Sequence, residues 1–183
     1  MRGVAISVFA LLALAGCETF SFHQYSMSQR NIDAIKQTMA EAGKSTLAIG
    51  EFNAAASGLS NVDCGINGQI RTPHQVPFVQ YIRDALIDEV KKANAYSLDQ
   101  IEADKVITGY LDNIKLNSSN GSWDFKLIIT FKSGKSFTVM ESYPFDGSSC
   151  EQSAAAFNPA VQDLIFNIIN HPVFREELGL PGN

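Results

Sequence analysis

Residue types that carry several common functions are scarce in this chain. Its 183 residues include only three histidines and three cysteines, all scattered, whereas zinc sites need clustered ligands of these kinds. Basic side chains number 14 against 19 acidic ones, so the positive surface of a nucleic-acid-binding protein is missing. After the N-terminal segment, no apolar run reaches the roughly 20 residues of a transmembrane helix. We expect no metal or other cofactor, no nucleic-acid partner and no spanning helix.

Known catalytic motifs are missing as well. The sequence has no nucleophile elbow, no zinc-protease helix motif, no dinucleotide-binding glycine set and no EF-hand loop. Three acidic residues near the cysteines, Asp63, Asp146 and Glu151, are interpreted as surface carboxylates. The alternative is that they form the acid/base pair of an envelope hydrolase, which would need convergent polar groups in a cleft. The sequence therefore favours a protein that is not an enzyme.

Large apolar side chains, in contrast, are plentiful. The chain has 12 Phe, five Tyr and one Trp, and 45% of its residues are hydrophobic. A disordered protein would have few of these. The length fits a single domain with a real core.

The first seventeen residues have the composition of a secretory signal. Arg2 precedes about a dozen apolar residues, which small residues follow. The segment ends in Leu14-Ala15-Gly16-Cys17, which resembles the lipobox of bacterial lipoproteins. The resemblance implies cleavage of residues 1–16 as a signal peptide. It also implies diacylglycerol on the Cys17 sulfur and an acyl chain such as palmitate on the new amino terminus. An ordinary signal peptide with a chance cysteine is the alternative.

The residues after Cys17 bear on location and on domain organisation. Glu18, not Asp, follows the cysteine, and by the enterobacterial sorting rule this favours the periplasmic face of the outer membrane over the inner membrane. Residues 17–27 are expected to be a lipidated tether that reaches at most about 35 Å. Its aromatic residues are expected to dock on the domain rather than on lipid headgroups. Residues 28–183 are expected to form a single α/β domain.

The two remaining cysteines, Cys64 and Cys150, form an even pair in an oxidising compartment. A disulfide between them is the expected state. No Cys-x-x-Cys motif is present, so we interpret the bond as structural rather than redox-active. A catalytic Cys64 is the alternative, but the sequence shows no base to activate it.

Hydrophobic periodicity predicts the element order α-β-α-β-β-β-α. Helices are expected from Ser28, from Pro77, over 154–169 and in a short turn from Pro172. Strands are expected over 46–52, 105–116, 123–131 and 137–145. The alternation slips at Asp112-Asn113, which indicates a bulge or the end of pairing. The stretch 53–76 is expected to be a long loop.

This order predicts an α+β fold in two layers. A β-α-β crossover followed by an antiparallel meander makes a four-stranded mixed sheet with helices packed on one face. In that topology Cys64 and Cys150 both follow strands that run in the same direction. Both cysteines then lie at one edge of the sheet, within reach of each other.

Two segments carry a resemblance to a group of envelope proteins. They are Asp104-Lys105-Val106-Ile107-Thr108-Gly109-Tyr110-Leu111 and Ala155-Ala156-Phe157-Asn158-Pro159-Ala160-Val161-Gln162. With the lipobox and the element order, they resemble small proteobacterial outer-membrane lipoproteins of the YajG-like kind. They are also similar to the wider group with the TolB amino-terminal α/β layout, which includes the LpoB activator of peptidoglycan synthases. The resemblance covers roughly residues 46–170 and implies action by binding envelope partners.

We therefore expect a non-catalytic lipoprotein that binds or helps to assemble another envelope component. Its candidate partner surface combines the disulfide-joined edge with the uncovered sheet face. The residues expected there are Asp63, Arg71, Lys126, Ile128, Thr130 and Met140. The alternative is a carrier of a small apolar ligand or lipid, with a cavity lined by Phe125, Ile129 and Leu164.

Overall fold

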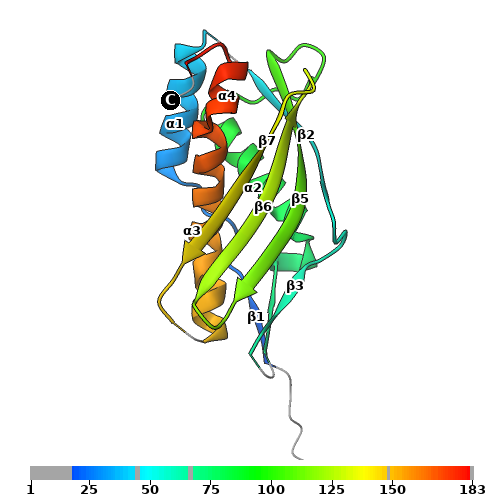
Figure 1. Cartoon of the computed structure of the whole chain (residues 1–183), viewed down its shortest axis with the longest axis vertical. Helices are drawn as coiled ribbons and strands as arrows, with labels where there is room; N and C mark the ends of the chain where they lie inside the picture. Colours follow the sequence, from blue (N-terminus) through cyan, green and yellow to red (C-terminus); the bar gives the residue numbers. More distant parts are fainter. Residues whose placement is uncertain (1–17, 44–45, 66–67, 148, 182–183) are drawn as a thin grey trace, which may run out of the picture.

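The computed structural model describes residues 18–43, 46–65, 68–147 and 149–181. Cys17 and the expected signal peptide lie outside the described residues. Within these ranges the fold is α+β, as predicted, with a four-stranded sheet, a smaller three-stranded sheet and four α-helices (Figure 1). Within the described ranges, no helix has both the length and the apolar character needed to cross a membrane.

The larger sheet has the predicted topology. Its strands are β2 (Leu47–Ala54), β5 (Lys105–Asn117), β6 (Ser122–Phe131) and β7 (Ser136–Pro144), in the order β2-β5-β6-β7. β2 pairs parallel with β5, and the other pairs are antiparallel. The register shifts between Leu111 and Asn113, which confirms the predicted bulge. From Trp123 to Phe131, alternation of apolar and polar residues along β6 specifies this register, because each inward side chain is buried and each outward one is only partly buried.

The helices cover one face of this sheet (Figure 1). They are α1 (Gln29–Glu41), α2 (Phe78–Lys92), α3 (Cys150–Asn170) and α4 (Pro172–Glu177). The helix expected from Pro77 is α2, and its apolar stripe, which includes Phe78, Ile82, Leu86 and Val90, is buried along its length. α3 begins at Cys150 because Ser149 and Gln152 form a capping box there, four residues earlier than predicted.

The expectation of a long loop over 53–76 is wrong. That stretch contains β3 (Asn61–Cys64), β4 (Gly68–Arg71) and the 3₁₀ helix η1 (Pro73–Gln75). With β1 (Glu18–Ser21), the two strands form the smaller sheet in the order β1-β4-β3. Each strand has only four residues, too few for alternation to show in the sequence.

The expected tether is, in its described part, docked on the domain. β1 pairs parallel with β4 from Glu18 to Ser21, and Phe22 follows it into the core with only 4% of its surface exposed. Tyr25 is half-buried against the same core. The expected docking of these aromatic side chains on the domain is thus what the structure shows.

An aromatic cluster joins the N-terminal segment to the rest of the molecule. The Phe22 ring stacks on Phe157 of α3 with centroids 3.9 Å apart, and it meets Phe78 of α2 and Trp123 of β6 edge-on at 5.8 and 5.7 Å. Burying a phenylalanine side chain contributes roughly 1.5–3 kcal/mol, and aromatic pairs add to this. The segment before α1 is therefore part of the core.

Candidate functional site

One face of the four-stranded sheet carries no helix (Figure 1). We call it the open face. Strand pairing arranges its residues in cross-strand rows: Thr108–Thr130–Ser136, Tyr110–Ile128–Thr138, Asn113–Lys126–Met140 and Lys115–Asp124–Ser142. Four residues of the predicted partner surface, Lys126, Ile128, Thr130 and Met140, share this face as expected.

Apolar side chains are exposed in the middle of the open face. Met140 is 76% exposed and Tyr110 is 40% exposed, and Ile128 lies between them on the central strand. Sequence reasoning missed Tyr110 as a surface residue, although its position two residues after Thr108 in an alternating strand places both side chains on one side. Exposed apolar side chains that gather on one face are typical of a binding surface.

The loop between α2 and β5 extends the open face beside the first residues of β5. Ile101 in that loop is 85% exposed and lines a hollow of about 330 Å³ with Val106 and Thr108. The Lys132 ammonium donates to the Gln100 carbonyl at 3.4 Å and holds the loop against the end of β6. No periodic pattern in the sequence indicated the position of Ile101.

Polar groups on the open face are paired within the face. Lys126 forms an ion pair with Asp112 at 2.8 Å, and the Ser142 hydroxyl donates to Asp124 at 2.6 Å. Charges of both signs are thus balanced around the apolar centre. Such a face suits an uncharged or mixed protein surface better than a strongly charged ligand.

The other two predicted residues, Asp63 and Arg71, lie in the smaller sheet. Gln69 lies between them: its amide donates to Asp63 at 3.4 Å and its carbonyl oxygen accepts from Arg71 at 3.1 Å. They form a short polar row at the disulfide-joined edge, where they were expected, in a different sheet from the open face. The strands of the smaller sheet, which sequence reasoning missed, account for this separation.

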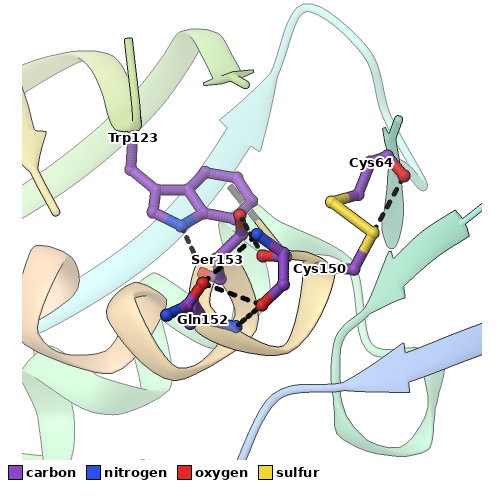
Figure 2. Close-up of a disulfide and its surroundings, with 6 residues drawn as sticks. Cys64, Trp123, Cys150, Gln152 and Ser153 are labelled. Atoms are coloured by element: carbon purple, nitrogen blue, oxygen red, sulfur yellow. Dashed lines mark hydrogen bonds between the residues drawn. A yellow bond between two sulfur atoms is a disulfide. The ribbon is translucent and has the colours of Figure 1, made fainter. Parts of the chain in front are cut away.

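The predicted disulfide is present. Cys64 at the end of β3 is bonded to Cys150 at the start of α3, with Cα atoms 5.5 Å apart (Figure 2). Gly68, opposite Cys64 in the hairpin, is required here because a Cβ atom would lie 2.6 Å from the Cys150 sulfur. Behind the bond, the Trp123 indole donates to the Ser153 carbonyl at 2.8 Å. The bond and this contact fix the start of α3 to both sheets.

The three carboxylates around the disulfide do not form a buried pair. Asp63, Asp146 and Glu151 are all exposed. In the described part of the chain, no three His, Cys, Asp or Glu side chains are grouped as they would be to hold a metal ion. The hydrolase alternative gains no support from this arrangement.

A buried carboxylate lies elsewhere, under the N-terminal segment. Glu89 of α2 has no exposed surface, and its Oε1 accepts from the Tyr25 hydroxyl at 2.5 Å and from the Ser28 backbone N–H at 2.9 Å. Burial raises the pKa of Glu89 above its ordinary value, even though these hydrogen bonds act in the opposite direction. Burial, reinforced by the neighbouring Glu89, also raises the pKa of Tyr25. We interpret this group as a connection between the segment and α2.

The residues predicted to line a ligand cavity are packed instead. Phe125 is 3% exposed, and Ile129 and Leu164 have no exposed surface. They belong to the continuous core between sheet and helices. The carrier alternative therefore gains no support from these three positions.

A groove of about 540 Å³ beside α2 is a weaker candidate site. Tyr25, Tyr81, Arg83 and Tyr96 line part of it. Its polar side chains already hold the fold, because Arg83 donates to the Gly50 carbonyl at 2.7 Å and Tyr81 donates to the His23 carbonyl at 3.2 Å. A ligand would have to compete with these bonds.

Comparison with known proteins bears on the fold. No family model matches the chain, and no curated protein matches it. A crystal structure of a Xanthomonas campestris protein, described under the family name DUF330, superposes with a TM-score of 0.56 at 11% identity, covering 82% of this chain and 92% of that one. A second crystal structure, of a protein described only as uncharacterized, superposes with a TM-score of 0.48 at 12% sequence identity, covering 87% of this chain and 99% of that one. The chain thus shares its fold with a bacterial DUF330 protein. The narrower YajG-like or LpoB-type resemblance stays a prediction.

Proposed function

We propose that this protein is a lipid-anchored envelope lipoprotein that acts without catalysis by binding another envelope protein through the open face. One observation carries the proposal. Tyr110 and Met140 are exposed and Ile128 is half-buried between them, so the sheet keeps an apolar centre on the face opposite the helices. A partner with apolar side chains would remove this surface from water, which favours association.

The anchor in this proposal rests on the sequence. The lipobox resemblance gives Cys17 as the acylated residue, and Glu18 favours the periplasmic face of the outer membrane. Several acyl chains, at about 0.8 kcal/mol per buried CH₂, make attachment effectively permanent. A permanently attached protein meets partners in the same membrane or in the layer next to it.

The proposal is tested by photo-crosslinking in intact bacterial cells. A photoreactive amino acid at Met140 or Tyr110 should give a crosslinked envelope protein of one defined mass. Met27 is the matched control, because it is also exposed, at 46%, but lies in the N-terminal segment away from the open face. The Ile128→Asp substitution should reduce the crosslink at Met140 at least tenfold.

Two results would overturn the proposal. One is equal crosslinking from Met140 and Met27. The other is crosslinking from Met140 that Ile128→Asp leaves unchanged while the variant keeps its native melting temperature. Ile128 is half-buried on an inner strand of the sheet, so the melting temperature of the variant is measured alongside the crosslink.

A further inference from the structure

The N-terminal segment of the domain leaves no free linker after the proposed acylation site. Glu18, the residue directly after Cys17, already pairs with Gly68, and pairing continues to Ser21 opposite Arg71. The Phe22 backbone N–H donates to the Arg71 carbonyl at 2.9 Å. Consecutive Cα atoms are about 3.8 Å apart, so Cys17 is one residue from a hydrogen-bonded strand.

Side-chain contacts hold the rest of the segment in place. Phe22 is buried in the aromatic cluster, and Tyr25 is bonded to Glu89. The Gln162 side chain of α3 donates to the Ser26 carbonyl at 2.7 Å. The segment is thus attached to both α2 and α3.

The same end of the molecule contains three other chain reversals. Gly68, the partner of Glu18, lies opposite Cys64 in the β3–β4 hairpin, and Cys64 is bonded to Cys150. The loop from β7 to α3 contacts the β5–β6 turn, where the Phe145 N–H donates to the Gly121 carbonyl at 2.8 Å. We call this end the disulfide pole.

The opposite end is formed by the β6–β7 turn and α4. The Ser133 hydroxyl donates to Glu177 at 3.1 Å, and Lys135 forms an ion pair with Glu176 at 2.8 Å. β6 has 10 residues and runs from one pole to the other, so at roughly 3.4 Å per residue the poles are about 30 Å apart. Figure 1 shows β1 near one end of the long axis and α4 at the other.

We propose that β1 fixes the orientation of the protein on its membrane, with the disulfide pole against the lipid surface and the long axis upright. This rests on the anchor of the proposed function. The strands of the larger sheet then rise away from the bilayer, and the open face points sideways. A partner would approach the open face from beside the protein, within about 30 Å of the lipid headgroups.

The test uses the acylated full-length protein in vesicles of phosphatidylethanolamine and phosphatidylglycerol. A donor dye is attached to a cysteine introduced by Ser118→Cys at the disulfide pole or by Lys132→Cys at the far pole, both exposed positions. Energy transfer to a dye on the lipid headgroups is then measured. We expect several-fold stronger transfer from position 118 than from position 132.

A ten-residue Gly-Ser insertion between Cys17 and Glu18 is the matched control. The insertion keeps the anchor and the fold but adds a flexible linker. The difference in energy transfer between positions 118 and 132 should therefore largely disappear. Similar transfer from both positions without the insertion would overturn the orientation and leave the anchor intact. A mass spectrum showing unmodified Cys17, in protein that does not float with the vesicles, would overturn the anchor and the orientation together.

Discussion

Glu89 is the residue whose environment departs furthest from what its type prefers. A charged glutamate is rarely fully buried, and this one has hydrogen-bond donors on Oε1 and, among the described residues, none on Oε2. Burial outweighs the donors and raises the pKa of Glu89 above 4.5. Its protonation therefore affects how firmly Tyr25 and the N-terminal segment are held.

Because Glu89 is buried, the free energy of unfolding should depend on pH, and the Glu89→Gln substitution should remove the contribution of this group. Because the pKa is raised in the folded protein, the folded state binds the proton more tightly than the unfolded chain does. The stabilisation that the proton on Glu89 provides is complete below the pKa of this group in the unfolded chain, about 4.5. It is lost as the pH rises through the pKa of Glu89 in the folded protein. The free energy of unfolding should therefore fall over that window by about 1.4 kcal/mol per unit of pKa elevation.

Urea unfolding between pH 4 and pH 8 measures this effect. The Glu89→Gln variant should show a flatter profile than the native protein. Exposed Glu102 is the control, and Glu102→Gln should keep the native profile. If the free energy of unfolding of the Glu89→Gln variant fell with pH as steeply as that of the native protein, Glu89 would not be the responsible group.

At the scale of elements, the Cys64–Cys150 bond joins parts that have few other contacts with each other. It links the β3–β4 hairpin to the start of α3 across 86 residues of sequence. Crosslinking so long a loop restricts the unfolded chain, and loop-closure entropy gives a stabilisation of about 4 kcal/mol. The hairpin in turn supports β1 through β4.

Reduction should therefore lower the free energy of unfolding by about 4 kcal/mol. The same loss is expected in a variant carrying Cys64→Ser and Cys150→Ser, and that variant should not respond further to reductant. Denaturant unfolding with and without dithiothreitol makes the comparison. A stability that reductant leaves unchanged in the native protein would show that the bond contributes little.

The elements that could be predicted from the sequence are those with a repeating pattern of their own. β6 alternates over its whole length, and α2 has a continuous apolar stripe, so both were found. The smaller sheet was missed because β1, β3 and β4 are each four residues long and are stabilised mainly by one another. Pairing between residues 18–21 and 68–71 is a non-local property, and no window of sequence contains it.

At the scale of the whole molecule, the N-terminal segment belongs to the folding unit. A chain beginning at Ser28 would lose β1, Phe22 and the hydroxyl partner of Glu89. Removing a buried phenylalanine side chain alone costs about 3–5 kcal/mol. For a protein of this size, that corresponds to a fall of about 10 °C or more in the melting temperature.

The matched control is a chain that begins at Glu18 and keeps the whole segment. Thermal unfolding of the two chains, both without the acyl group, should show this difference. Equal melting temperatures would mean that residues 18–27 act only as a tether.

β7 is one of the two edge strands of the larger sheet, with β2 at the other edge, and it carries a carboxylate on the face that the helices cover. Glu141 accepts from the Asn167 side chain of α3 and is only partly buried, and among the described residues no further strand pairs with the outer side of β7. A second chain adding its own strand at this edge would bury that charge, which is a common protection of sheet edges against aggregation. Burial raises the pKa of Glu141, so the protection weakens on acidification. Strand addition at this edge should therefore be resisted more strongly at neutral pH than in acid.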